Sequence, residues 1–161
     1  MSVSVLTAPA RAPSGEEAVA DAVAAARAAQ RTWAATPLTV RLRAVAAMRR
    51  RLGDRGVELA ERVTAAHPLR SSAAETLVAE VLPLADACRF VERAGARVLS
   101  RKRLGGWGRP AWLWGVSGDI SREAWGVVLI VAPSNYPLLL PGVQMVQALA
   151  AGHAAVLKAG R

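Results

Sequence analysis

Cysteine and long apolar runs are scarce in this sequence, and each shortage excludes a class of protein. Cys88 is the only cysteine, so the chain forms no internal disulfide and no metal site built from several cysteines. No apolar run approaches the ~20 residues that a membrane span requires. The N-terminus lacks the basic region and apolar stretch of a signal peptide. We therefore expect a cytoplasmic protein in a reducing compartment, without a bound metal and without a membrane partner.

Acidic residues and lysines are also few. The chain has 21 lysines and arginines against 12 aspartates and glutamates, a formal net charge of +9, and its only lysines are Lys102 and Lys158. Arginine-rich proteins often bind nucleic acid by neutralising phosphates, with tryptophans such as Trp112 and Trp114 stacking on bases. Here most arginines are dispersed, which is typical of solvated helix faces. We expect no nucleic-acid partner, and a basic nucleic-acid binder stays open as an alternative hypothesis.

The first hundred residues have the spacing of amphipathic helices. Apolar residues recur at intervals of three and four between residues 19 and 98, interrupted at Gly53 and Gly56, after which we expect a separate short helix. Ser72 and Glu75 have the spacing of a capping box, which predicts a helix start. Pro83 falls inside the following helix and predicts a kink or a restart there.

Cys88 falls on the apolar face of that last helix. A small buried hydrophobic side chain is the common use of such a cysteine. We therefore predict a structural thiol and not a nucleophile.

Glycine and tryptophan become frequent after residue 104, in "LGGWGRPAWLWGVSGDISREAWGVV". The turn "VSGD" predicts a β-hairpin, with one strand near residues 110–116 and the other entering at Ile120. Trp112 and Trp114 would then share one face, because side chains alternate along a strand. Exposed rings on a hairpin are typical of an interface.

The last forty residues predict a strand, a helix and a second strand. Residues 127–132 form a nearly continuous apolar run, as expected of a parallel strand covered on both faces. Residues 138–151 have a helical pattern that ends at Gly152, where a C-cap glycine belongs, and residues 154–158 read as a short strand. The fold class is α/β: N-terminal helices, a β-hairpin and the first βαβ unit of a Rossmann-like parallel sheet. That sheet is incomplete, because sheets mostly have ~4–6 strands.

Polar residues follow both strands of this unit. Ligands in open α/β sheets bind beyond the carboxyl ends of the strands. Asn135 lies in a turn stiffened by Pro133 and Pro137, and its amide can donate to a carbonyl oxygen that gains negative charge. Lys158 ends the second strand and can hold a ribose hydroxyl or a phosphate. The sequence lacks G-x-G-x-x-G and the Walker lysine motif, so the usual phosphate loops are absent.

The motifs between residues 122 and 158 resemble the aldehyde dehydrogenase superfamily. Its members carry a G-V-V strand, a P-x-N-[FY]-P turn, a helix ending in A-L-A-A-G-N and a V-x-K-P strand end. The matching residues here are, in order, Gly126-Val127-Val128, Pro133-Ser134-Asn135-Tyr136-Pro137, residues 148–153 and Val156-Leu157-Lys158-Ala159. The resemblance implies the N-terminal portion of such a protein. It divides the chain into a helical part of the cofactor domain (1–104), a hairpin arm of oligomerisation type (105–124) and the truncated start of the NAD(P)-binding core (125–161).

The resemblance also implies roles for individual residues. Asn135 corresponds to the family asparagine of the oxyanion hole, and Lys158 to the lysine at the adenine ribose of NAD or NADP. The cofactor would lie along the strand-end turn, which comprises Ala132, Pro133 and Ser134. Arg161 stands where NAD-preferring members often have a glutamate, and an arginine there would favour the extra phosphate of NADP.

The departures from the family pattern concern both single residues and whole motifs. Ser134, His153 and Ala159 stand where members commonly have an aromatic residue, an asparagine and a proline. The nucleophilic cysteine, the general-base glutamate and the glycine motif of the family come later in the chain and have no counterpart here. Cys88 lies too early to take the role of the nucleophile.

The resemblance therefore implies an NAD(P)-dependent oxidoreductase that converts a small-molecule aldehyde to a carboxylic acid through a thioester and assembles as a homo-oligomer through the hairpin. Without the nucleophile, the chain alone is expected to be inactive. Two alternatives stay open: an acyl-CoA reductase of the same superfamily, and a non-catalytic module that binds a partner or a cofactor through its βαβ unit.

Overall fold

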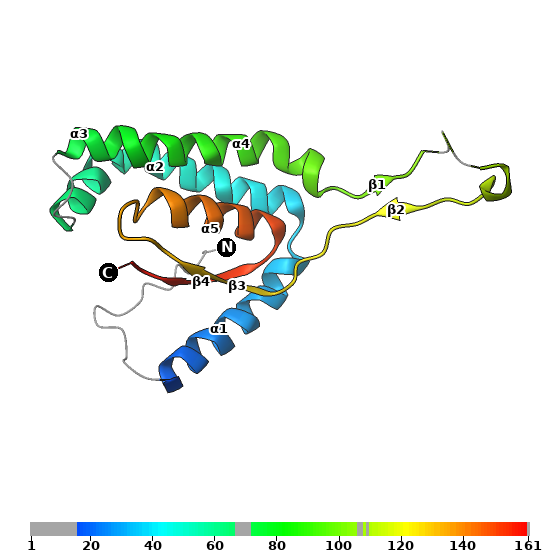
Figure 1. The fold of residues 1–161 in the computed structure, drawn as a ribbon, viewed down its shortest axis with the longest axis horizontal. Coiled ribbons are helices and arrows are strands. Elements are labelled where there is room, and N and C mark those ends of the chain that lie inside the picture. The colour runs from blue at the N-terminus through cyan, green and yellow to red at the C-terminus, as the bar shows by residue number, and fades with distance from the viewer. Residues whose placement is uncertain (1–15, 67–71, 106–107, 109, 161) are drawn as a thin grey trace.

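The computed structural model describes residues 16–66, 72–105, 108 and 110–160. The elements in chain order are α1 (Glu16–Ala35), α2 (Leu38–Ala66), α3 (Ala73–Thr76), η1 (Leu77–Val81), α4 (Leu82–Leu99), β1 (Lys102–Arg103), η2 (Ala111–Leu113), β2 (Asp119–Ile120), β3 (Val127–Val131), α5 (Leu139–Ala151) and β4 (Ala154–Lys158). A helical body holds a small parallel sheet, and a long two-stranded arm projects from one end of it (Figure 1). The predicted α/β fold class is confirmed.

The core lies between α2, α4 and α5. Its buried residues are Val45 and Leu52 from α2, Leu84 and Cys88 from α4, and Val146 and Ala150 from α5. The helices pack closely where one of them carries glycine: a Cβ atom on Gly142 would lie 2.8 Å from Leu84 Cδ1. Arg49 and Glu92 join α2 to α4 at the edge of this core through a bond of 2.6 Å between Arg49 Nε and Glu92 Oε1.

The predicted helix start at Ser72 is confirmed, since its Oγ accepts a hydrogen bond of 3.1 Å from Glu75 N. One turn later the helix widens into the π-helical segment η1, and α4 then begins with Pro83 in its first turn. The predicted restart at Pro83 is thus confirmed. Proline has no N–H to donate, and the wider π turn accommodates that missing bond.

Helix α2 consists of two helical segments that meet at a kink. The kink lies at Arg55, whose backbone is non-helical (φ −119°, ψ 17°), and the second segment continues to Ala66. The predicted interruption at Gly53 and Gly56, with a further helix after it, is therefore confirmed. Gly56 also serves close packing against η1, because it is buried and a Cβ atom there would lie 3.3 Å from Val81 Cγ1.

The βαβ unit is present as predicted, with α5 beginning one residue later than expected. Strands β3 and β4 are parallel, with Val127 opposite Ala154 and Val131 opposite Lys158. Gly152 ends α5 in the left-handed region at φ 93°. On β3, Ile130 is buried while its neighbours Leu129 and Val131 are 65% and 60% exposed. Those two side chains are not covered within the described chain, which agrees with the predicted incomplete sheet.

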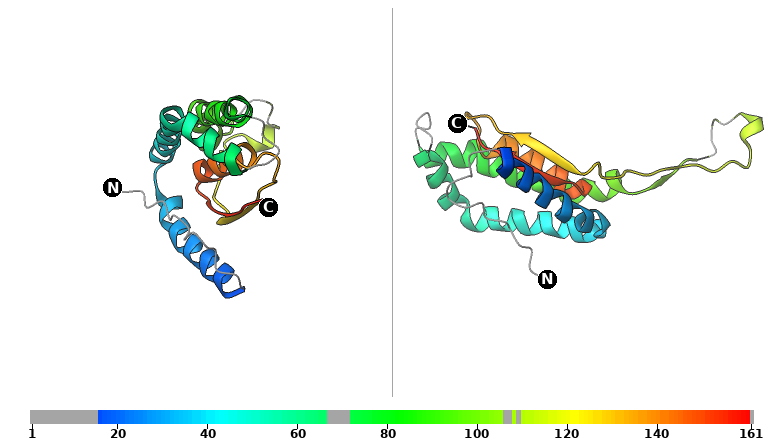
Figure 2. Two further views of the ribbon diagram at one scale, coloured as in Figure 1. Left: turned by 90° about the vertical axis from the view of Figure 1, so that its left-hand side faces the viewer. Right: turned by 90° about the horizontal axis from the view of Figure 1, so that it is seen from below.

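Helix α1 lies on the other side of the strands from α5 (Figures 1 and 2). Two side chains fasten it to the C-terminal end of α5. Trp33 Nε1 donates to the carbonyl oxygen of Leu149 at 2.8 Å, and Gln30 Nε2 donates to that of Gly152 at 3.2 Å. None of the helices in the part of the chain described here is long and apolar enough to cross a membrane.

The arm is held together near its base. Strand β1 pairs antiparallel with β2, with Lys102 opposite Ile120, and Leu104 N donates to Gly118 O at 2.8 Å. The first strand predicted over residues 110–116 is wrong, because η2 turns there (Figure 2). Pro110 lacks a donor for strand pairing, and Gly115 has a φ of 88°, so this stretch cannot continue a β-ladder.

Candidate functional site

The ends of β3 and β4 meet at one edge of the sheet. Ala132 N, directly after β3, donates to Lys158 O at the end of β4 over 2.8 Å. The turn from Pro133 to Pro137 leaves from the same point. The structure therefore brings the predicted turn residues and the Lys158 strand end together, as expected from the parallel pairing.

The side chains at this edge differ in exposure. Ala132 is buried and Pro133 is half-buried, whereas Ser134, Asn135 and Lys158 are exposed. The polar atoms of the edge are thus accessible to a ligand while the backbone beneath them is packed. Arg161, the sixth predicted site residue, lies outside the described residues.

The chain that leaves β4 rests on the turn that leaves β3. A Cβ atom on Gly160 would lie 2.6 Å from Pro133 C and 2.7 Å from both Pro133 O and Ser134 N. Contacts this short do not occur, so only glycine fits without moving one of the two segments. The turn is therefore supported from the β4 side as well as by its own prolines.

Sequence reasoning missed a residue that contacts the far end of the turn. Glu80, in η1, is fully buried, and its Oε2 accepts hydrogen bonds from Leu138 N at 2.8 Å and Leu139 N at 3.0 Å. These are the amides of the N-cap residue and of the first residue of α5. A signal did exist in the sequence, because Glu80 is a carboxylate three residues after Leu77 and four before Leu84, on an otherwise apolar helix face.

The cysteine takes no part in this edge. Cys88 is fully buried in the helical core. Burial raises the pKa of its thiol, and the nearby Glu92 carboxylate raises it further. A protonated thiol without solvent access is a poor nucleophile, so the predicted structural role is confirmed. In the ranges covered by the structure, no group of three or more histidine, cysteine, aspartate or glutamate residues is arranged to hold a metal.

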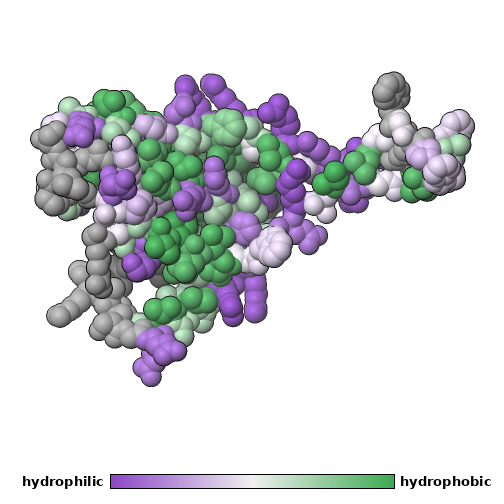
Figure 3. All heavy atoms as spheres, viewed as in Figure 1, coloured by the Kyte–Doolittle hydropathy of each residue, from purple (hydrophilic) through white to green (hydrophobic). Residues whose placement is uncertain are grey.

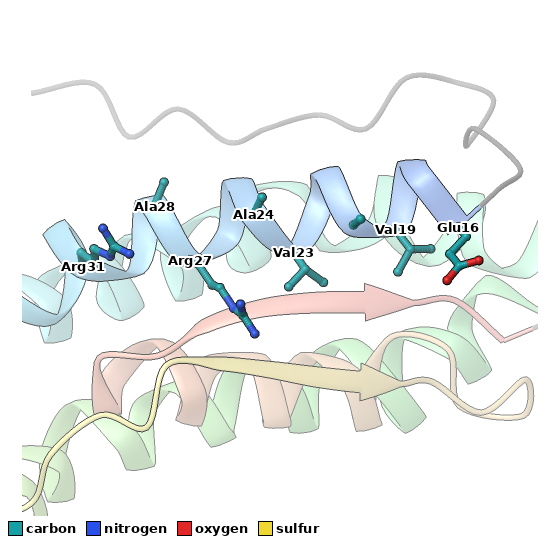
Figure 4. Close-up of a pocket in the computed structure, with 8 residues that line it drawn as sticks. Glu16, Val19, Val23, Ala24, Arg27, Ala28 and Arg31 are labelled. Atoms are coloured by element: carbon teal, nitrogen blue, oxygen red, sulfur yellow. The ribbon is translucent and has the colours of Figure 1, made fainter.

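A hollow runs along α1 (Figure 4). Val23 and Arg27 point from the helix toward the sheet, and Ala24 and Ala28 point away from it. The described residues that line the hollow all belong to α1. Among the residues that the structure describes, polar groups from different elements do not converge there, and we assign no chemistry to the hollow.

Apolar surface gathers over β3 and α5 on the face shown in Figure 3. Leu129, Val131 and Leu140 are exposed on these elements, and Leu157 is exposed on β4. The candidate site therefore borders an uncovered apolar surface.

Comparison with known proteins yields consistent matches. A model of the aldehyde dehydrogenase family matches residues 7–161. A 4,4'-diapolycopene aldehyde oxidase of Methylomonas sp is 27% identical over 127 residues, which cover 78% of this chain and 23% of that protein. Malonate-semialdehyde dehydrogenase 2 of Shouchella clausii is 29% identical over 145 residues, which cover 90% of this chain and 28% of that protein.

A solved structure matches as well. The NADP-dependent glyceraldehyde-3-phosphate dehydrogenase of Bacillus halodurans C-125, complexed with NADP, superposes with a TM-score of 0.77 at 28% identity. The match covers 90% of this chain and 30% of that one. The chain thus spans about a quarter of the length of the relatives it matches. Because the family model covers nearly the whole sequence, the chain belongs to the aldehyde dehydrogenase family.

Proposed function

We propose that this chain supplies the N-terminal part of an NAD(P)-dependent dehydrogenase that oxidises a small-molecule aldehyde to a carboxylic acid through a thioester. The observation that carries the proposal is the 2.8 Å bond from Ala132 N to Lys158 O. This bond joins the two strand ends from which the Asn135 turn and the Lys158 side chain project. Ligands of open parallel sheets bind at this edge.

Asn135 is the proposed catalytic residue of this part. Its exposed amide donates an N–H to the aldehyde oxygen, which gains negative charge when a thiolate adds to the carbonyl carbon. Cys88 does not supply that thiolate, since it is buried between helices away from this edge. The thiolate and the general base are therefore supplied by other residues of the complete enzyme, and the chain alone is expected not to turn over an aldehyde.

The residues at the edge fit a dinucleotide in their chemistry. Lys158 offers three N–H donors in an exposed position, suited to ribose hydroxyls or to a phosphate. Ala132, Pro133 and Ser134 provide the surface along which the cofactor extends, and Arg161 is proposed to favour NADP. The nicotinamide, when bound, accepts a hydride. The NADP complex of the Bacillus halodurans relative supports this assignment.

The remaining proposals concern organisation. Residues 1–104 form the helical part of the cofactor domain, residues 105–124 an arm for homo-oligomerisation, and residues 125–161 the start of the NAD(P)-binding core, in a cytoplasmic protein. The exposed rings of Trp112 and Trp114 at the arm support the oligomerisation role.

A second candidate is a non-catalytic module that binds a partner or a cofactor through the βαβ unit. The exposure of Leu129 and Val131 on β3 favours it, since apolar strand residues are usually covered. An acyl-CoA reductase shares the thioester chemistry. It is distinguished from a dehydrogenase by assaying the complete enzyme with an acyl-CoA and with a free aldehyde as substrates.

The proposed cofactor site is tested by titrating NADP+ and NAD+ into the chain by isothermal calorimetry. We expect Lys158→Ala to weaken binding at least tenfold, because its contacts to ribose or phosphate are lost. Asn135→Ala is the matched control at the same edge and is expected to leave cofactor affinity unchanged. Equal affinity of the wild type and Lys158→Ala, or the absence of binding by the folded chain, would contradict the assignment.

A further inference from the structure

A carboxylate is buried at the point where α5 begins. Glu80 has no solvent exposure, and one of its oxygens accepts both Leu138 N and Leu139 N. A buried carboxylate is costly unless hydrogen bonds compensate for the lost water. Here the two amides are N–H groups that α5 cannot satisfy itself, and the positive end of the helix dipole adds further stabilisation. Leu138, the N-cap residue, has no capping side chain of its own.

The helix that carries Glu80 departs locally from regular α-helical geometry. Glu80 lies in the π-helical segment η1, where Leu82 N bonds to Leu77 O, five residues back. The extra residue in this turn rotates the following side chains by roughly 100° relative to a regular α-helix. Single π turns are frequent at functional sites. The π turn thus decides which side chains of this helix face α5.

The segment around Glu80 is anchored from α2. Thr76, fully buried one turn before Glu80, shares a hydrogen bond of 2.7 Å with Thr64 of α2. On the other side, Gly56 of α2 allows close contact with Val81. The carboxylate therefore projects from a fixed support.

This support reaches the proposed catalytic turn. Leu138 is three residues after Asn135, so the Glu80 bonds fix the end of the turn. Its beginning is fixed by the bond from Ala132 to Lys158 and by the contact of Gly160 with Pro133. A donor that stabilises charge in a transition state must be held in place before the reaction.

We infer that Glu80 is a positioning residue for Asn135: its buried carboxylate caps α5 and thereby fixes the turn from which the Asn135 amide projects. The catalytic meaning of this inference rests on the proposed function of Asn135. The position of the turn that carries Asn135 can be tested without a substrate.

The test is NMR spectroscopy of the isotope-labelled 161-residue chain and three variants. Glu80→Leu removes the acceptor and keeps the side-chain volume, Glu80→Gln keeps one acceptor oxygen, and Glu92→Gln removes the carboxylate that pairs with Arg49, away from α5. The readouts are hydrogen exchange of the Leu138 and Leu139 amides and the side-chain amide resonances of Asn135.

In Glu80→Leu we expect exchange of both amides to accelerate at least tenfold beyond any global change, together with a shift of the Asn135 side-chain resonances. Glu80→Gln is expected to restore most of the protection, and Glu92→Gln to leave the Asn135 resonances in place. Unchanged Asn135 resonances in folded Glu80→Leu would overturn the inference.

A second measurement applies if Glu80→Leu does not fold. Glu80→Asp keeps the carboxylate on a side chain one methylene shorter, so it should withdraw the acceptor from Leu138 N and Leu139 N, accelerate the exchange of both amides and shift the Asn135 side-chain resonances. Unchanged exchange and unchanged Asn135 resonances in Glu80→Asp would overturn the inference. The NADP+ titration on the same samples is independent of these readouts, so failure of the proposed function and failure of the positioning role are told apart.

Discussion

At the scale of single residues, the thiol of Cys88 makes stability depend on alkaline pH. Burial first, and the Glu92 carboxylate second, raise the pKa of the folded-state thiol above its unfolded value of about 8.5. The protonated thiol therefore favours the folded state. Its contribution is complete below the unfolded pKa and is lost as pH rises above it toward the folded pKa.

We accordingly expect the free energy of unfolding of the wild-type chain to fall above about pH 8.5. In Cys88→Ala it should fall less over the same range, starting from a lower value at neutral pH because the core is truncated. Urea unfolding followed by circular dichroism between neutral and alkaline pH measures the free energy of unfolding of each protein. Parallel pH profiles of the two proteins would contradict the prediction. A thiol reagent should label Cys88 only after unfolding.

Single residues also show where sequence reasoning succeeds and where it fails. Cys88 was predictable, because its place on an apolar helix face determines its burial. The role of Glu80 was not, because its partners Leu138 and Leu139 lie 58 and 59 residues away in the sequence. A carboxylate on an apolar face indicates that some partner exists, but only the packing of η1 against α5 identifies it.

At the scale of elements, the helix that continues through η1 into α4 depends on its first cap. Ser72 Oγ accepts the Glu75 amide, an N–H without an intrahelical partner. Ser72→Ala should lower the free energy of unfolding by about 1 kcal/mol. Urea titration followed by circular dichroism measures this loss.

The matched control is Ser121→Ala, in the exposed segment after β2, which should stay within about 0.5 kcal/mol of the wild type. Equal losses in both variants would mean that the Ser72 cap contributes no special stability.

Elements with a strong local pattern were predicted closely. Strand β4 has the predicted bounds, because its apolar run is short and has clear ends. Helix α5 ends at Gly152 as expected, because this glycine adopts the left-handed backbone conformation that other residues avoid. The first strand of the arm was predicted incorrectly, because alternating tryptophans imitated a strand although Pro110 and Gly115 prevent pairing. In α2 the glycines indicated the correct place for a break, since the backbone leaves the helical region at Arg55, between Gly53 and Gly56.

At the scale of the whole molecule, the arm carries apolar surface far from the helical body. Trp112 lies in η2 and Trp114 directly after it, and the two rings are 82% and 80% exposed. The helical turn η2 is at the far end of the arm (Figure 2). If the arm mediates homo-oligomerisation, replacing both tryptophans with serine should lower the assembly mass measured by light scattering after gel filtration, because the interface loses large apolar area. Val57→Ser, which changes an exposed residue of α2, is the control. An unchanged mass in the double variant would exclude the tip as the interface.

The placement of the tryptophans has an optical consequence. Trp125, between the arm and β3, is 98% exposed, and among the tryptophans that the structure describes only Trp33 bonds to the body. Three of the four described tryptophans are therefore exposed to water, and their emission reports the surroundings of the arm and its base. A blue shift on raising the protein concentration would register arm burial directly. Unfolding of the helical core would change that emission little, so a fluorescence melt of this chain would mostly record its association and not its stability.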